Sequence, residues 1–112
     1  MNEKKLGKIT KATFGLGGYQ DCCLGLHLSF EGAGYGVSST ESFWDFQSIK
    51  HSDHCQWTEA DRSRHCRETL EKVSETLNLA KKEHVAQLVG VPVELEFDGM
   101  LLKSWRVLTE VL

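Results

Sequence analysis

Arg106 is the residue whose chemistry most needs an explanation. It lies near the end of the 112-residue chain, two positions after Ser104. A guanidinium group keeps its proton in proteins, and burying it without a partner is costly. Arg106 must therefore pair with an acidic side chain, lie at the margin of the sheet, or face an anionic ligand. In the last case its planar fork, with the Ser104 hydroxyl beside it, suits a phosphate or a carboxylate.

Aromatic side chains are concentrated in the stretch 38–57: Phe43, Trp44, Phe46 and Trp57. Two interpretations are open. The rings either pack this stretch onto a sheet, or some of them form a platform on which a nucleobase stacks, a contact worth about 1–3 kcal/mol per base. Under the second interpretation, Phe43 and Trp44 are the candidate base contacts.

A glycine-rich turn at 15–18 precedes three residues with polar groups, Tyr19, Gln20 and Asp21. Glycines let backbone amides approach an anion closely, and Tyr19 and Gln20 would add side-chain contacts. The turn has neither the lysine and spacing of a P-loop nor the glycine pattern of a dinucleotide-binding fold. On its own it is a weak phosphate motif.

One group of side chains contains potential zinc ligands: His51, His54, Cys55, His65 and Cys66. Adjacent ligands fit one tetrahedral ion poorly, and Cys66 also fits the apolar stripe of a helix, so we expect no metal and no cofactor. No nucleophile stands in a recognisable pattern with a base and an orienting group. The sequence therefore predicts a binding protein and not an enzyme.

The first elements that would position these residues are strands. Residues 8–14 are rich in β-branched and aromatic side chains, which favour a strand. The next strand alternates between an apolar face and a face of small or polar residues: Leu24, Leu26, Leu28 and Phe30 against Cys23, Gly25, His27 and Ser29. A turn at 31–34 leads into a short third strand near 35–37, and the three strands make an antiparallel meander.

Residues 38–57 fit no single element. After them, Thr58 is the expected N-cap of a helix, and Asp61 completes a capping box. An apolar stripe follows at helical spacing: Cys66, Leu70, Val73, Leu77 and Ala80. Asn78 or the Lys81-Lys82 pair marks the last turn. A short second helix, Glu83–Val89, is expected to stop at Gly90.

The C-terminal segment predicts a hairpin. Residues 91–97 alternate between apolar and polar types, and Asp98-Gly99 is a two-residue turn signal. Counting outward from that turn places Arg106 opposite Val91, with Ser104 on the same apolar face. A bulge would shift this register.

These elements predict one α+β domain, residues 1–112, in which an antiparallel sheet packs against one long and one short helix. The sheet combines the N-terminal meander with the C-terminal hairpin. The net charge of −3 argues against a nucleic-acid duplex or an anionic membrane as partner. No stretch approaches the ~20 apolar residues of a membrane span, and the N-terminal segment lacks an apolar signal core, so we expect a cytoplasmic location.

Three stretches resemble segments of a group of small phage- and prophage-encoded proteins: Leu6–Thr10, Phe14–Asp21 and Leu102–Leu112. The likeness spans nearly the whole chain and includes the helix start Trp57-Thr58-x-x-Asp61-Arg62. The chain looks most similar to the phage anti-defence proteins that sequester the cyclic ADP-ribose signal of Thoeris immunity. The resemblance implies a homo-oligomer that binds a nucleotide without cleaving it. It also implies Arg106 as a phosphate contact and Phe43, Trp44 or Tyr19 as base contacts.

The expected function is therefore sequestration of a small cyclic nucleotide immune signal by a phage protein in the host cytoplasm. The alternative is a phage inhibitor that contacts a host defence complex directly, in the manner of an anti-CRISPR protein. A third hypothesis is a structural domain stabilised by zinc.

Overall fold

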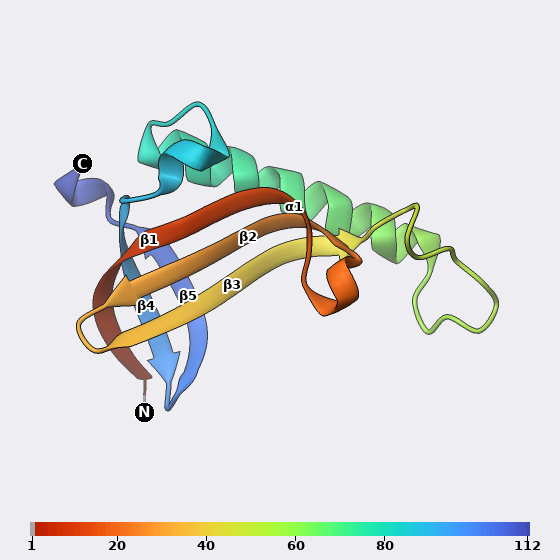
Figure 1. Cartoon of the computed structure of the whole chain (residues 1–112), viewed down its shortest axis with the longest axis horizontal. Coiled ribbons are helices and arrows are strands. Elements are labelled where there is room, and N and C mark those ends of the chain that lie inside the picture. The colour runs from red at the N-terminus through yellow and green to blue at the C-terminus, as the bar shows by residue number, and fades with distance from the viewer. Residues whose placement is uncertain (1) are drawn as a thin grey trace.

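The computed structural model describes residues 2–112, and all structural statements below refer to them. It contains a five-stranded antiparallel sheet in the order β3-β2-β1-β4-β5. The strands are β1 (Asn2–Gly17), β2 (Cys23–Gly32), β3 (Tyr35–Trp44), β4 (Pro92–Asp98) and β5 (Leu101–Val107). The helix α1 (Glu59–Ala80) and the 3-10 turns η1 (Tyr19–Asp21), η2 (Val85–Leu88) and η3 (Thr109–Val111) complete the fold (Figure 1). The predicted α+β class, with its meander and hairpin, is confirmed.

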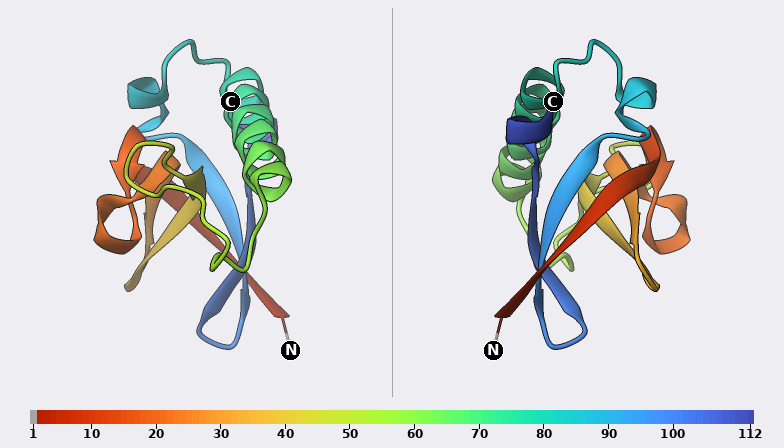
Figure 2. Two further views of the ribbon diagram at one scale, coloured as in Figure 1. Left: turned by 90° about the vertical axis from the view of Figure 1, so that its right-hand side faces the viewer. Right: turned by 90° about the vertical axis from the view of Figure 1, so that its left-hand side faces the viewer.

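The long strand β1 belongs to both halves of the sheet. Its residues 2–8 pair with β4, and its residues 8–17 pair with β2. Thr10 is an extra residue between the pairs Ile9–Phe30 and Lys11–Ser29. A bulge of this kind bends a strand and increases its twist. The sheet therefore curls, and its two halves cross at a large angle (Figure 2).

The hydrophobic core fills the inside of the curl. The alternation predicted for β2 is confirmed, because Leu26, Leu28 and Phe30 are buried. They pack in one cluster with the inward residues of the other strands and of the helix end, among them Ile9, Ala80, Val93, Leu95 and Val107. Trp105 of β5 lies against this cluster, with its ring centroid 5.1 Å from that of Phe30.

The helix begins where the sequence predicts. The Thr58 hydroxyl accepts a hydrogen bond from the backbone N–H of Asp61, and the Asp61 carboxylate accepts one from the backbone N–H of Thr58. The predicted apolar stripe is right in its C-terminal part, because Val73, Leu77 and Ala80 pack in the core. It is wrong at Leu70, which is 52% exposed, while Thr69 is 1% exposed. α1 packs mainly beside β3.

Two boundaries differ from the predictions. The third strand runs to Trp44, well beyond 37, so only residues 45–57 form the connection to α1 apart from the N-cap. The expected short helix Glu83–Val89 is the single 3-10 turn η2. Within residues 2–112, no helix has the length and apolar character that a membrane span requires.

The C-terminal hairpin forms, but its predicted turn lies one residue too early. Asp98 pairs with Leu101, so the two turn residues are Gly99 and Met100. Gly99 has a φ of 64°, and glycine with positive φ at the first turn position is typical of a type II′ turn.

A bulge follows this turn and decides where Arg106 points. Lys103 is an extra residue between the pairs Phe97–Leu102 and Glu96–Ser104. The shifted turn and the bulge together place Arg106 opposite Glu94. The predicted position of Arg106 and Ser104 on the apolar face is therefore wrong, since both lie on the outer face with the glutamates of β4.

Candidate functional site

Polar side chains gather on the outer face of β1, β2 and β3, opposite the hydrophobic core. Because side chains alternate between the faces of a strand, His27 and Ser29 of β2 point outwards between buried neighbours. Their register partners share this face: Thr13 and Lys11 on β1, and Thr40 and Ser38 on β3. Residues from three strands thus meet on one surface.

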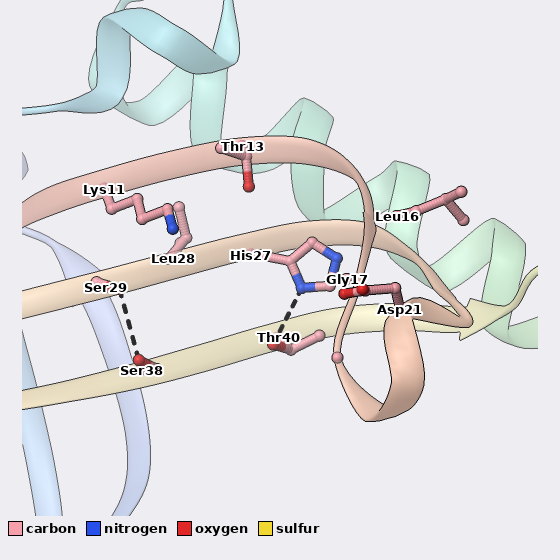
Figure 3. Close-up of a pocket in the computed structure, with 11 residues that line it drawn as sticks. Lys11, Thr13, Leu16, Gly17, Asp21, His27, Leu28, Ser29, Ser38 and Thr40 are labelled. Carbon is pink, nitrogen blue, oxygen red and sulfur yellow. Dashed lines mark hydrogen bonds between the residues drawn. The ribbon is translucent and has the colours of Figure 1, made fainter.

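These side chains line a cavity of about 350 Å³, which we call the polar cavity (Figure 3). Its lining residues are Lys11, Thr13, Leu16, Gly17, Gly18, Asp21, His27, Leu28, Ser29, Ser38 and Thr40. Figure 3 shows the His27 ring between the ends of the Lys11 and Asp21 side chains, with the η1 segment curving below it.

His27 is held by two hydrogen bonds. Its Nε2 lies 3.1 Å from the carbonyl oxygen of Gly15, and its Nδ1 lies 3.3 Å from the Thr40 hydroxyl oxygen. A carbonyl only accepts, so Nε2 must carry a proton. In the neutral ring Nδ1 then accepts from Thr40. A Cβ at Gly17 would lie only 3.0 Å from His27 Nε2, so a larger residue at this position would require the ring to shift.

The turn that carries Asp21 has an unusual backbone. Gln20 and Asp21 have φ values of 51° and 56°, in the left-handed region. This conformation costs about 1–2 kcal/mol for each residue with a Cβ. It brings Asp21 to the cavity, whereas Tyr19 and Gln20, both predicted ligand contacts, are exposed and lie outside the cavity lining.

The charges of the polar cavity are not neutralised within the described chain. None of the ion pairs found in residues 2–112 involves Lys11 or Asp21. The cavity therefore offers a free ammonium group, a free carboxylate, an imidazole and several hydroxyls. This set can bind a ligand that has both an anionic group and hydroxyl donors.

A second hollow lies where the curl brings the edge strands β3 and β5 near each other. This seam cavity has a volume of about 250 Å³ and is lined by Ser38, Ser39, Glu41, Lys72, Leu102, Lys103, Ser104 and Trp105. Ser38 lines both cavities. Of the predicted ligand contacts, Ser104 lies in the lining of the seam cavity.

Arg106 is neutralised by two glutamates. Its Nε donates to Glu94 at 3.0 Å, and its two terminal nitrogens donate to the two carboxylate oxygens of Glu110, each at 3.0 Å. These hydrogen bonds raise the pKa of Arg106 and hold the pKa of Glu110 at about 2. Arg106 thus pairs with acids and also lies at the margin of the sheet, on the edge strand β5. It lies outside both cavities.

The aromatic stretch packs around a buried arginine that the sequence analysis missed. The Arg62 guanidinium carbon lies 4.8 Å from the ring centroid of Phe46 and 4.5 Å from that of Trp57. Phe43 is 6% exposed, and its ring centroid lies 5.7 Å from that of Phe46. The carbonyl of Trp44 accepts a long hydrogen bond of 3.4 Å from Arg62. Packing, and not an open stacking platform, is the interpretation that these contacts favour for Phe43, Phe46 and Trp57.

Arg62 itself has few polar partners. Its side chain is 2% exposed, and its Nε lies 3.0 Å from Glu59 Oε1 without making a hydrogen bond of good geometry. The signal for this arrangement was present in the sequence, since Arg62 lies four residues before Cys66 and therefore on the same face of α1.

The histidine and cysteine group has other contacts. His51 Nε2 lies 3.0 Å from the carbonyl of Trp57, and the Cys55 thiol lies 3.8 Å from the Ser52 hydroxyl. Among residues 2–112, no three His, Cys, Asp or Glu side chains form a set that could hold a metal ion.

Comparisons with protein families, with curated proteins and with solved structures give no match. The geometry of the polar cavity is therefore the observation from which a function can be inferred.

Proposed function

We propose that this protein binds a small phosphate-bearing molecule of the nucleotide class in the polar cavity and holds it without cleaving it. The observation that supports this proposal is the unpaired Lys11 and Asp21 in one cavity with His27 and several hydroxyls. The volume of the polar cavity, about 350 Å³, lies within the ordinary range for small-molecule sites.

Each group of the cavity has a role in this proposal. Lys11 attracts the phosphate, and the hydroxyls of Thr13, Ser29 and Ser38 donate hydrogen bonds to its oxygens. Asp21 accepts hydrogen bonds from ribose hydroxyls, which a carboxylate does well. The chain carries a net charge of −3, so a phosphate must be attracted locally, and the free ammonium group of Lys11 supplies that attraction.

The resemblance to phage anti-defence proteins suggests the biological role within this proposal. The ligand is then a cyclic nucleotide immune signal of the cyclic ADP-ribose type, sequestered in the host cytoplasm. A homo-oligomer belongs to the proposal because one copy leaves the cavity open to solvent, and ligand sites are often completed at interfaces. Arg106 has no ligand contact in this proposal, because Glu94 and Glu110 occupy its guanidinium group.

Calorimetric titration with cyclic ADP-ribose isomers and cyclic dinucleotides tests the proposal. We expect binding that Lys11→Ala and Asp21→Ala each weaken at least tenfold, by about 1.4 kcal/mol. Lys82→Ala, on the exposed segment after α1, is the matched control. Mass spectrometry of the recovered ligand should show it intact, and an altered mass would indicate an enzyme. An absence of heat with every compound defeats the proposal.

Inhibition of a host protein complex is the second candidate function, and the shape of the molecule favours it. The accessible surface is 7312 Å², while a compact protein of 12.6 kDa exposes about 6200 Å². The radius of gyration is 15.2 Å, against about 13 Å for a compact domain of this length. This excess surface is comparable to the about 800 Å² that one partner buries in a standard interface. A host protein captured equally by the wild type and by Lys11→Ala would favour this function over ligand binding.

A further inference from the structure

We propose that the N-terminal part of β1 is a docking edge for an extended acidic segment of a partner protein, which adds a strand beside residues 2–6. This proposal is independent of ligand binding in the polar cavity. The polar cavity involves the C-terminal half of β1, whereas the docking edge is its N-terminal half. There β1 extends beside the β4–β5 hairpin, away from β2 and β3 (Figure 2).

The docking edge has free backbone groups. Residues 2–7 pair with β4 on one side, and the ladder with β2 begins only at Lys8. The Tyr35 hydroxyl donates to the carbonyl of Leu6 at 2.8 Å, so this carbonyl points away from β4. Because backbone groups alternate in direction along a strand, the N–H and C=O groups of Lys4 and Asn2 point to the same open side. A partner strand can bond to them without disturbing β4.

The charge of the docking edge selects an acidic partner. Lys4, Lys5 and Lys8 are exposed, and no ion pair found in residues 2–112 involves them. The Lys5 ammonium group also lies over two rings, 5.3 Å from the centroid of Tyr35 and 5.6 Å from that of Phe97. Glu3 is the one acid among residues 2–8, so this segment carries a net charge of +2 (three lysines minus one glutamate) in a chain of −3. The acids Glu94, Glu96 and Asp98 lie on β4, on the side of β1 away from an added strand. Edge lysines discourage pairing with apolar or basic strands. They leave acidic strands as the favoured partners.

An apolar hollow lies on each face of the docking edge. On the inner face, Tyr35, Val37, Phe97 and Met100 line a hollow of about 260 Å³ beside Lys5. The outer face has a more open hollow of about 480 Å³, whose lining includes Leu6, Gly32, Gly90 and Pro92. An added strand directs successive side chains to opposite faces, so apolar side chains at its centre could enter both hollows. Backbone bonds with flanking side-chain pockets are typical of strand addition.

The probe is a short fluorescein-labelled peptide with valines at its centre and glutamates at both ends. Its matched control has lysines in place of the glutamates. Fluorescence anisotropy should show that the acidic peptide binds and the basic one does not. Amide resonances of Asn2, Lys4 and Lys5 should shift in ¹⁵N–¹H spectra, while those of the polar cavity should not.

Lys4→Pro removes an N–H on the open side and spares the bonds to β4. The variant should therefore fold but no longer bind the acidic peptide. The double change Lys4→Glu and Lys5→Glu keeps the backbone and should weaken binding about tenfold or more. Lys82→Glu and Lys11→Ala should leave the affinity unchanged. Equal affinity for both peptides, shifts confined to other elements, or unaltered binding by the double variant would overturn the proposal. If the wild type self-associates and Lys4→Pro abolishes this self-association, the partner is a second copy of the chain and the proposal is overturned.

Discussion

Arg62 carries a positive charge in a place that water hardly reaches, with aromatic rings of Phe46 and Trp57 as its nearest large neighbours. Cation–π attraction grows when the cation is desolvated, to about 2 kcal/mol or more per contact. The single acid beside it, Glu59, is exposed. The arginine therefore holds the connection 45–57 against the start of α1 mainly through its flat packing surface.

We expect Arg62→Ala to lower the free energy of unfolding by about 2–4 kcal/mol, because it removes both aromatic contacts and leaves a void. Arg64→Ala is the control, since Arg64 is exposed and pairs with Asp61 and Glu68 at the surface. That change should cost about 0.5 kcal/mol or less. Urea denaturation of the variants measures both, and similar losses for the two would contradict the role given to Arg62.

The Arg106–Glu110 pair makes a prediction about pH. Hydrogen bonds from Arg106 lower the pKa of Glu110 from 4.5 to about 2. A carboxyl group with a lowered folded-state pKa stabilises the fold above its unfolded pKa, and this contribution is lost as the pH falls through the folded value. Wild type should therefore exceed Glu110→Gln in urea midpoint above about pH 5, and the difference should shrink towards about pH 2. Glu83→Gln, which removes no ion pair found in the described chain, should show no such change. A difference that persists undiminished in acid would speak against this pairing.

At the scale of the elements, local signals predicted where the helix and the second strand begin. The capping box at Thr58 and the alternation from Leu24 to Phe30 each act within a few residues, and both are present in the structure. Where two elements meet, local signals were insufficient. The buried face of α1 includes Thr69 and Thr76 and leaves Leu70 exposed, which the apolar spacing of the helix did not indicate.

The cap predicts a measurable contribution to stability. Thr58→Ala removes the hydroxyl that accepts from the Asp61 N–H, and should cost about 1 kcal/mol. Thr58→Ser keeps the acceptor and should cost only a small part of this. Chemical denaturation checks both variants, and an equal loss for serine and alanine would show that the threonine methyl, and not the cap, is what matters.

Two bulges explain most of what the sequence did not reveal about the site. The predicted hairpin register failed because Lys103 adds a residue and the turn uses Met100. The polar cavity was only partly predictable. His27 and Ser29 were assigned to the polar face of their strand, but bringing Lys11 beside them requires the register beyond Thr10. Such pairings depend on the curl of the whole sheet and leave no local pattern.

At the scale of the whole molecule, β1 connects the two halves of the sheet and Ile9 lies at the junction. Its side chain is 0% exposed. Its N–H donates to the carbonyl of Val91 at 3.0 Å, and its carbonyl accepts from the N–H of Gly90 at 2.7 Å. Ile9 therefore contacts the core through its side chain and the segment between η2 and β4 through its backbone. This double attachment should make unfolding cooperative.

We expect Ile9→Ala to cost about 3 kcal/mol and to keep a single unfolding transition. Circular dichroism and tryptophan fluorescence should give coincident curves for the wild type and the variant. Leu6→Ala, on the exposed part of the same strand, should cost about 0.5 kcal/mol or less. Two separate transitions in either protein would mean that the halves fold independently.

The extra residue Thr10 has one more consequence. Before it, the inward side chains of β1 stand at odd positions such as Ile9, and after it they stand at even positions such as Ala12. Thr10 therefore changes the phase of the strand. Deleting this single residue would reverse the two faces of one half of β1. Either Lys4 and Lys8 of the first half would turn inward, or Phe14 and Leu16 of the second half would turn outward. A related chain that keeps this architecture must keep the length of this segment, even where it keeps none of the side chains.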